Sequence, residues 1–360
     1  MMNKKIIFSA GGTGGHIFPA INLMRHFYEK GYNVVLVTDK RGNNFLNKDS
    51  KFRSYELKTG TPTSKNLLGK IISLIIIFFS LLKSIGILKK EKADLVIGFG
   101  GYVSFPTSFA SKFFNIPLVL YEPNIAIGRA NKYLLSIAKK IFLGKDIKEK
   151  FSEKYKSKVD VVGSIIDKNI VNYLKFKKKN KKENFSILVL GGSQGAKIFG
   201  EIIPSVINLI KQQGYTIQIN QQCTGNQKDS IINYYKEKSI KNYVFEFEKN
   251  ILDLILSSDL AITRCGASAT AELVHTSTPF IAVPIPDSID NHQYLNAKYY
   301  EDKGYCWILD QKNFNEKNLF NLMIEIIKNK KKLENKYENM KKDYTDNVYN
   351  VIETKIKEII

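Results

Sequence analysis

Two stretches of the chain follow the same plan, and this repeat restricts the possible folds more than any other feature. The first runs KKIIFSA, GGTGGH, IFPAINLMRHFYEK and GYNVVLVTD; the second runs FSILVL, GGSQGA, KIFGEIIPSVINLIKQQ and GYTIQIN. Each has the pattern of a strand, a glycine-rich turn, an amphipathic helix and a second strand. Because this order opens a doubly wound parallel sheet, the chain is predicted to contain two Rossmann-like domains.

The length and the remaining pattern support a two-domain α/β chain. The 360 residues exceed what one hydrophobic core usually holds. The lysine-rich run KFKKKNKKENF has the composition of a solvated linker. We therefore expect two Rossmann-like domains facing across a cleft, over residues 1–163 and 185–343. A linker region is expected over 164–184, and a C-terminal helix at about 344–360 that packs back on the first domain.

Charge is unevenly distributed along the chain. The net charge is +21, with 27 basic and 11 acidic residues in 1–163 but 28 and 23 in the remainder. An excess confined to one half suggests that this half faces nucleic acid or an anionic membrane surface. A general compositional preference for lysine could also explain the total charge of +21. It explains the uneven distribution of the charge less well.

The cysteines and the N-terminus indicate the compartment. Cys223, Cys265 and Cys306 are widely spaced and lack the spacing of metal ligands, as expected in a reducing environment. The start MMNKKIIFSAGG has too few apolar residues before its glycines for a signal peptide. A cytoplasmic protein is therefore expected.

One apolar run has two possible roles. Ile71–Leu82 is free of charge and lies between Lys70 and Lys83. Its 12 residues would form about 18 Å of helix against a hydrocarbon core of ~30 Å, so we expect it not to span a bilayer. It is either a buried helix packed on a sheet or a helix that rests on lipid. The lipid contacts would be Phe78, Phe79 and Leu82, surrounded by Lys65, Lys70, Lys83, Lys89, Lys90 and Lys92.

The first domain offers two glycine-rich turns after strands. In GGTGGH, backbone amides and a positive helix end can converge on an anion, which suggests phosphate binding. The spacing is neither GxGxxG nor GxxxxGK, which disfavours ordinary dinucleotide and P-loop sites. GFGGYVS forms the second turn, and the two together could hold a diphosphate; tight packing of helix on strand is the alternative for both.

A histidine and a tyrosine accompany these turns. His16 begins the helix after GGTGGH, where a neutral imidazole could accept a hydroxyl proton, although a lone histidine is often structural. Tyr102 could add a hydroxyl group.

The second domain offers polar groups at corresponding turns. Ser193 and Gln194 lie at a helix N-terminus suited to phosphate, and Glu272 could bind ribose hydroxyls. The loop PIPDSIDNHQYLNA could recognise sugar hydroxyls. The sequence has no DxD motif, so no metal site is expected and backbone amides and helix ends would neutralise a leaving diphosphate.

Six motifs in order resemble those of the MurG family of UDP-N-acetylglucosamine (UDP-GlcNAc) transferases. They are GGTGGHIFPA, GFGGYVSFP, YEPNIAIGRANK, GGSQGAK, RCGASATAEL and PIPDSIDNHQYLNA, and the match extends from about residue 5 to 310. The resemblance implies a GT-B fold and transfer of GlcNAc, with inversion and without metal or cofactor, to the MurNAc C4 hydroxyl of lipid I. Lipid I is undecaprenyl-diphosphate-linked MurNAc-pentapeptide, and the product is lipid II for peptidoglycan synthesis.

The resemblance also implies a setting and a set of site residues. The chain would be a peripheral protein on the cytoplasmic face of the cell membrane, with other cell-wall synthesis proteins as candidate partners and no nucleic acid. His16 would be the catalytic base, and Gly100, Gly101, Tyr102 and Glu122 would bind the acceptor. The donor would contact Thr13, Gly14, Gly15, Asn124, Ser193, Ala267, Ser268, Ala269, Thr270, Ala271, Glu272 and Gln293.

The chain departs from the family pattern at three places. Tyr121 stands where the family has the histidine of HEQN, Asp167 replaces an arginine near the donor, and the uracil-binding segment EFEKNI is divergent. Lys168 could replace the missing cation. A related transferase with a diacylglycerol acceptor and an inactive cell-wall scaffold protein are therefore kept as alternatives, whereas nucleic-acid binding lacks a recognition motif.

Overall fold

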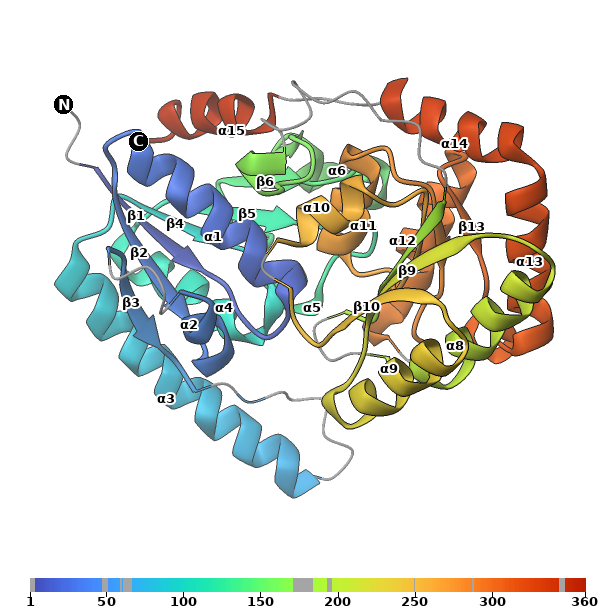
Figure 1. Cartoon of the computed structure of the whole chain (residues 1–360). Helices are drawn as coiled ribbons and strands as arrows, with labels where there is room; N and C mark the ends of the chain where they lie inside the picture. The colour runs from blue at the N-terminus through green and yellow to red at the C-terminus, as the bar shows by residue number, and fades with distance from the viewer. Residues whose placement is uncertain are drawn as a thin grey trace. The chain divides into compact units, whose positions relative to one another are not determined.

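Two parallel β-sheets organise the chain, each with its own helices (Figure 1). The computed structural model describes residues 4–46, 51–58, 60, 67–170, 184–192, 196–248, 250–286, 288–342 and 347–360. The chain divides into two units, Met1–Asp167 with Thr345–Ile360, and Lys168–Tyr344. The predicted α/β class with two parallel-sheet domains is confirmed.

The first unit contains a seven-stranded sheet in the order β3-β2-β1-β4-β5-β6-β7, with every adjacent pair parallel. The chain reverses its direction of winding between β1 and β4, so the loops after these two strands diverge. A ligand binds at such a switch point in open α/β sheets. The strands are β1 (Lys5–Ser9), β2 (Asn33–Thr38), β3 (Arg53–Glu56), β4 (Leu95–Gly98), β5 (Leu118–Glu122), β6 (Lys140–Leu143) and β7 (Val159–Val161).

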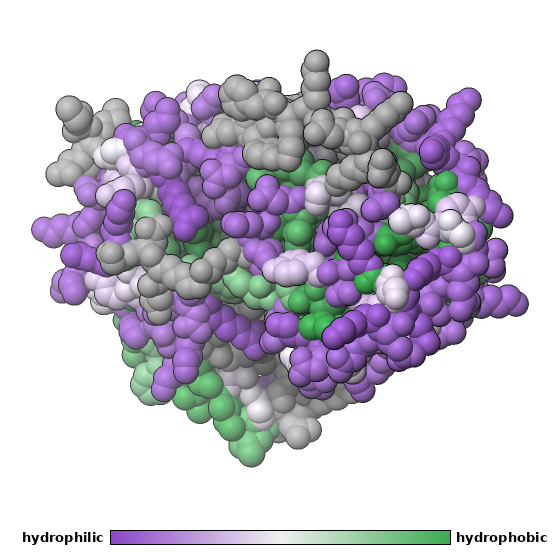
Figure 2. All heavy atoms as spheres, viewed as in Figure 1, coloured by the Kyte–Doolittle hydropathy of each residue, from purple (hydrophilic) through white to green (hydrophobic). Residues whose placement is uncertain are grey.

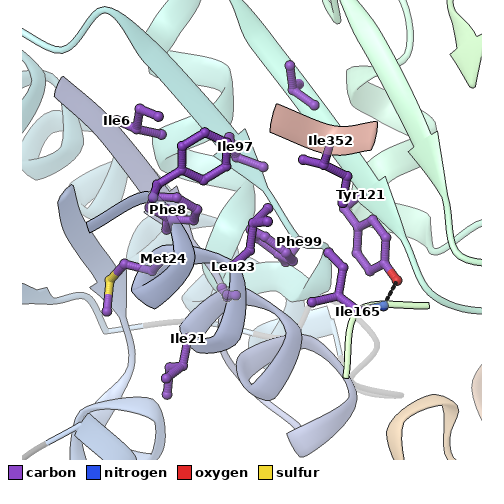
Figure 3. Close-up of a cluster of buried hydrophobic side chains, with 14 of the residues drawn as sticks. Ile6, Phe8, Ile21, Leu23, Met24, Ile97, Phe99, Tyr121, Ile165 and Ile352 are labelled. Atoms are coloured by element: carbon purple, nitrogen blue, oxygen red, sulfur yellow. Dashed lines mark hydrogen bonds between the residues drawn. The ribbon is translucent and has the colours of Figure 1, made fainter. Parts of the chain in front are cut away.

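The helices of this unit follow the strands in the usual alternation. They are α1 (Gly14–Glu29), α2 (Lys40–Leu46), α3 (Leu67–Glu91), α4 (Gly101–Ala110), α5 (Arg129–Leu134), α6 (Glu153–Lys156) and α15 (Val348–Lys357), with 3-10 turns η1 (Ser111–Phe114) and η2 (Lys148–Lys150). Phe8, Phe99 and Tyr121 form a continuous aromatic row in the core, with neighbouring ring centroids 6.2 and 5.6 Å apart (Figure 3).

The C-terminal helix α15 completes the first unit. Its Val348, Ile352 and Ile356 are buried in the same core cluster as Phe8. His26 Nε2 of α1 lies 3.0 Å from Glu353 Oε2, and Lys355 Nζ lies 2.7 Å from Asp160 Oδ1. The helix is thus held by buried apolar contacts, by a polar contact with α1 and by an ion pair with β7.

The second unit contains a six-stranded parallel sheet in the order β10-β9-β8-β11-β12-β13, with a switch point between β8 and β11. Its strands are β8 (Phe185–Leu190), β9 (Ile217–Gln222), β10 (Lys241–Phe245), β11 (Leu260–Thr263), β12 (Phe280–Ala282) and β13 (Cys306–Ile308). Its helices are α8 (Lys197–Gln212), α9 (Lys228–Glu237), α10 (Ile251–Leu256), α11 (Ala267–His275), α12 (His292–Asp302), α13 (Glu316–Lys328) and α14 (Lys330–Lys342). The 3-10 turns are η3 (Gly225–Gln227), η4 (Ile289–Asn291) and η5 (Gln311–Asn313).

Helix α3 differs from two of the sequence-based expectations for the apolar run, its short length and its burial. It has 25 residues and therefore measures about 37 Å, because the helix continues on both sides of the charge-free run. By length and composition alone it could cross a membrane, so the length argument against spanning was wrong. The buried-helix alternative was wrong too, since only 28% of its most apolar window is buried.

Between Leu68 and Gly86 the buried residues of α3 are serines, whereas Ile87, Leu88 and Glu91 are buried at its C-terminal end. Ser73, Ser80 and Ser84 are buried, and Ser84 Oγ lies 3.1 Å from Thr107 Oγ1 of α4. Small side chains allow the two helices to approach closely, and their hydroxyl groups bond to each other or to main-chain carbonyls. The large side chains consequently face outward, where Figure 2 shows a hydrophobic strip along α3. Those exposed are Leu68, Ile71, Ile72, Leu74, Ile75, Phe78, Phe79 and Leu82.

The C-terminal end of α3 is anchored by a buried carboxylate. Glu91 accepts hydrogen bonds from Lys5 Nζ at 3.0 Å, Arg53 Nη1 at 3.0 Å and Tyr55 Oη at 2.5 Å. Burial raises the pKa of Glu91, but these hydrogen bonds outweigh it and lower the pKa to about 2. The ionised carboxylate thus ties α3 to β1 and β3.

Candidate active site

His16 lies where the two glycine turns of the first unit meet. Thr13 has an extended backbone and precedes α1, so His16 falls in the first turn of that helix. A Cβ atom on Gly100 would lie 3.2 Å from His16 Cε1, and one on Gly101 would lie 3.4 Å from His16 Cδ2. The turn after β4 therefore packs directly against the imidazole.

The two glycines of this second turn have conformations that other residues rarely adopt. Gly100 has φ +83° and Gly101 has φ +74°. A side chain on Gly101 would also come within 2.9 Å of the Gly11 carbonyl oxygen. The glycines are thus required for close approach of the turns, and Tyr102 follows them as a half-buried residue in the first turn of α4.

Asp39, which sequence reasoning missed, organises the first glycine turn. Its carboxylate accepts hydrogen bonds from the backbone N–H of Gly12 at 3.0 Å and of Gly42 at 2.9 Å. One amide that we expected to face a phosphate is therefore bonded to a carboxylate. The available signal was the position of Asp39 directly after β2, where α/β nucleotide-binding folds commonly carry a functional acidic residue.

Glu122 is buried inside the loop that follows β5, Pro123–Gly128, which we call the β5–α5 loop. Its Oε1 accepts from the backbone N–H of Asn124 at 3.1 Å and from Asn124 Nδ2 at 3.3 Å. Its Oε2 accepts from the N–H of Gly128 at 2.8 Å and from Asn131 Nδ2 at 2.9 Å. Burial raises the pKa of this carboxyl group, although each of the four hydrogen bonds lowers it.

A second buried charged residue, Lys145, lies beside this loop. Unlike Glu122, it was not identified from the sequence. Its Nζ donates to the Pro123 carbonyl oxygen at 2.8 Å, and the residue is only 4% exposed. Burial lowers the pKa of Lys145 to about 8, while the negative charge of Glu122 acts in the opposite direction. No periodic pattern marks this lysine in the sequence, because it follows a strand like several exposed lysines.

The Tyr121 departure from the family pattern lies in the core. Its hydroxyl group accepts from the Ile165 N–H at 3.0 Å (Figure 3) and also donates to the Gly163 carbonyl at 3.3 Å. The side chain is 1% exposed. Tyr121 therefore ties β5 to the segment after β7, and its presence says nothing against activity.

In the second unit, the predicted donor turn has two faces. Ala267, Thr270 and Ala271 are buried in the first turns of α11, and Thr270 Oγ1 donates to the Gly266 carbonyl at 2.8 Å. The other predicted donor residues in these turns, Ser268, Ala269 and Glu272, are half-buried. Only the second set offers accessible side-chain atoms to a ligand. Ser193 and Gln194 lie outside the described residues.

Gln293 connects the loops beside this turn. Its Oε1 accepts from the backbone N–H of Cys265 at 3.2 Å and of Ile285 at 3.1 Å. Asn296 Nδ2 donates to the Cys265 carbonyl at 3.1 Å. The amide oxygen of Gln293 is thus used within the protein, so only its NH₂ group can serve a sugar ligand.

Arg264 is a buried cation at the end of β11 that sequence reasoning also missed. Its Nη1 donates to the Val283 carbonyl at 3.0 Å, its Nη2 donates to Gln311 Oε1 at 2.7 Å, and its guanidinium carbon lies 4.9 Å from the Phe199 ring centroid. Burial lowers its pKa. The side chain joins the end of β11 to the residue after β12, to η5 and to the start of α8.

Metal ligands are not clustered in the described part of the chain. Among those residues, no group of three or more His, Cys, Asp or Glu side chains is placed to hold a metal ion.

Comparisons with known proteins agree over the whole chain. Residues 6–143 match the glycosyltransferase family 28 N-terminal domain and residues 186–354 match its C-terminal domain. A Pelagibacter ubique protein is 40% identical, covering 100% of this chain and 99% of the relative, and a Rickettsia felis protein is 36% identical, covering 94% and 95%. Both are named UDP-N-acetylglucosamine–N-acetylmuramyl-(pentapeptide) pyrophosphoryl-undecaprenol N-acetylglucosamine transferase.

Solved structures agree on the fold. Acinetobacter baumannii MurG superposes with a TM-score of 0.77 at 24% identity, covering 99% of each chain. The calicheamicin glycosyltransferase CalG4 superposes with a TM-score of 0.72 at 12% identity, covering 100% of this chain and 98% of that one. With the two domain matches and the full-length identity to named relatives, the chain belongs to glycosyltransferase family 28 and, within it, to the MurG family.

Proposed function

We infer that this chain transfers GlcNAc from UDP-GlcNAc to the MurNAc C4 hydroxyl of lipid I and so forms lipid II for peptidoglycan synthesis. The observation that carries this inference is 40% identity to a so-named relative over the full length of both chains. The chain is a UDP-sugar glycosyltransferase of the EC 2.4.1 class. The glycine turns packed against His16 favour an active enzyme over an inactive scaffold.

In the proposed mechanism, the C4 oxygen attacks C1 of GlcNAc from the face opposite UDP, which inverts the anomeric centre. The new C–O bond forms as the C1–O bond to the β-phosphate breaks, through an oxocarbenium-like transition state. The electron pair leaves with UDP, and His16 accepts the hydroxyl proton. Backbone amides at helix N-termini of the second unit stabilise the departing diphosphate.

The site residues divide between the two units in this proposal. The first unit binds the acceptor through Gly100, Gly101 and Tyr102. The second binds UDP-GlcNAc through Ser268, Ala269, Glu272 and the NH₂ group of Gln293, which are accessible. Ser193 belongs to the same donor set, and Thr13, Gly14, Gly15 and Asn124 add contacts from the first unit.

Turnover in the presence of a chelator tests this function. With UDP-GlcNAc and a short-chain lipid I analogue, we expect UDP and lipid II analogue to form in equal amounts. An excess of EDTA over any adventitious divalent ion should change the rate by less than about twofold, because the sequence has no DxD motif that would hold a metal-bound diphosphate. Replacing the acceptor with diacylglycerol provides the control. Transfer to diacylglycerol alone, or abolition of turnover by EDTA, would overturn the proposal.

We further propose that the first unit docks on the cytoplasmic face of the cell membrane as a peripheral protein. The outward-facing side of α3 presents Phe78 and Phe79, which are 56% and 63% exposed. Lys70, Lys89 and Lys90 lie on the same helix, and anionic lipid attracts such lysines by about 1 kcal/mol each. Docking would concentrate the enzyme where a lipid-linked acceptor resides. Other cell-wall synthesis proteins stay predicted partners.

Substitution on α3 should release the protein from vesicles. Phe78→Ser with Phe79→Ser is expected to reduce co-sedimentation with phosphatidylglycerol vesicles by about tenfold or more, since each buried aromatic contributes roughly 1.5–3 kcal/mol. Phe247→Ser is the matched control, because Phe247 is also 63% exposed but belongs to the second unit. Equal binding of all variants, or binding that ignores both anionic lipid and salt, would contradict membrane docking through α3.

A further inference from the structure

Three charged side chains, one carboxylate and two ammonium groups, bond to the main chain of the β5–α5 loop. Glu122 accepts the backbone N–H groups of Asn124 and Gly128, at either end of the loop. Lys145 donates to the Pro123 carbonyl at 2.8 Å, and Lys150 donates to the Ile125 carbonyl at 3.1 Å. Donors and acceptors of one short main-chain segment are therefore both bonded to charged side chains, which form stronger hydrogen bonds than neutral ones.

Gly144, which follows β6, packs closely against the residues at the start of the loop. The Gly144 N–H donates to the Glu122 carbonyl at 2.9 Å. A Cβ atom on Gly144 would lie 2.9 Å from the Tyr121 hydroxyl oxygen and 3.3 Å from Pro123 Cα. Gly144 is therefore packed closely against the first residue of the loop. This packing brings the next residue, Lys145, within hydrogen-bond distance of the Pro123 carbonyl.

The same carboxylate reaches the His16 turn through one asparagine. Asn131 Nδ2 donates to Glu122 Oε2 at 2.9 Å and to the Tyr121 carbonyl at 3.2 Å. If Gly100 carried a Cβ atom, that atom would lie 3.3 Å from Asn131 Nδ2 and 3.2 Å from His16 Cε1. Asn131 and His16 therefore both lie next to Gly100. A displacement of Glu122 would therefore move Asn131 and with it the support of the Gly100 turn.

We propose that Glu122, Lys145 and Lys150 are positioning residues that lock the β5–α5 loop and, through Asn131, the turn against His16. In this account Glu122 does not contact the acceptor, which differs from the role that the family resemblance implied for it. The inference rests on the proposed transferase function for its kinetic consequences. Its structural part, a loop held by charges on both sides, does not depend on that function.

The test combines amide hydrogen exchange with steady-state kinetics on Glu122→Gln, Lys145→Met and the double variant. In Glu122→Gln a side-chain NH₂ group faces backbone donors, and in Lys145→Met a carbonyl loses its partner. We expect exchange of the Asn124 and Gly128 amides to accelerate at least tenfold in each single variant, while exchange in the strands is unchanged. Misplacement of His16 should lower kcat by about 10- to 100-fold.

The double variant separates positioning from direct contact. If both residues act on one loop, their effects are coupled, and the double variant should fall within about threefold of the worse single variant. If Glu122 contacts the acceptor instead, Glu122→Gln should raise the KM for the acceptor and Lys145→Met should have nearly wild-type kinetics. The losses of the two single variants should then multiply in the double variant. Lys148→Met is the matched control, because Lys148 is a nearby exposed lysine without such a contact in the described structure.

Each possible failure has a separate signature. Should Glu122→Gln not fold, Lys150→Met tests the same lock from an exposed side chain, with an expected three- to tenfold loss of kcat. If the wild-type protein makes no lipid II, the proposed function is overturned. Hydrogen exchange would still test whether Glu122, Lys145 and Lys150 hold the β5–α5 loop. Normal turnover with unchanged exchange of Asn124 and Gly128 in the variants would overturn the lock alone.

Discussion

Replacing His16 with alanine is expected to lower kcat by about 10²- to 10⁴-fold while the KM for UDP-GlcNAc changes by less than about threefold. The reason is that a positioned general base contributes about this much to the rate and takes part only in the transition state. His16 lies in the first turn of α1, against the glycine turn that follows β4. Initial rates with a soluble lipid I analogue at varied donor concentration provide the measurement.

A second histidine supplies the control for this experiment. His275 is in the last turn of α11, at the other end of the helix from the predicted donor turn. His275→Ala should therefore keep kcat within about twofold of wild type, as expected for a change away from the site. If His16→Ala lowers turnover by less than about threefold with donor affinity intact, another group is the base.

Replacing Gly100 with alanine is expected to lower kcat by about 10- to 100-fold through His16. Gly100 has φ +83° and ψ −174°, a backbone region that is essentially restricted to glycine and costs other residues about 1–3 kcal/mol. The new Cβ would meet His16 Cε1 at 3.2 Å and Asn131 Nδ2 at 3.3 Å. The imidazole has to give way by a few tenths of an ångström, and catalysis by a positioned base depends on its alignment with the reacting group. Kinetics and thermal unfolding should be measured together.

Gly86→Ala is the matched glycine control. Gly86 lies within α3, and a Cβ there would have no atom within 4 Å. Alanine in a helix interior should stabilise the fold by up to about 1 kcal/mol and leave kcat unchanged. Wild-type kcat in Gly100→Ala would mean that the turn after β4 does not position His16.

The fold followed from local patterns in the sequence. Strand, glycine turn and helix recur twice at the same spacing, and such periodicity depends mainly on near neighbours in the chain. The parallel order then follows from the right-handed connection of successive strands. The motifs also led to the family, because several of them occur in the right order.

The orientation of α3 could not be predicted in the same way. The sequence showed an apolar run but not which side of the helix is buried, and Ser73, Ser80 and Ser84 had no part in that prediction. Ser84 contacts Thr107 of α4, Ser80 donates to the Lys58 carbonyl, and Ser73 lies against Gly60, so each is buried by a residue more than ten positions away in the chain. An outward-facing apolar surface is thus a product of helix packing rather than of composition.

By itself, the sequence determined two doubly wound sheets, the glycine turns that bring His16 to a strand end, and the family. The tertiary structure decided how polar groups are paired: Asp39 with the Gly12 amide, Glu122 with its own loop, Lys145 with the Pro123 carbonyl. The physical reason is that secondary structure is specified by contacts a few residues apart. A hydrogen bond between Lys145 and Pro123 exists only after β5 and β6 have paired in register.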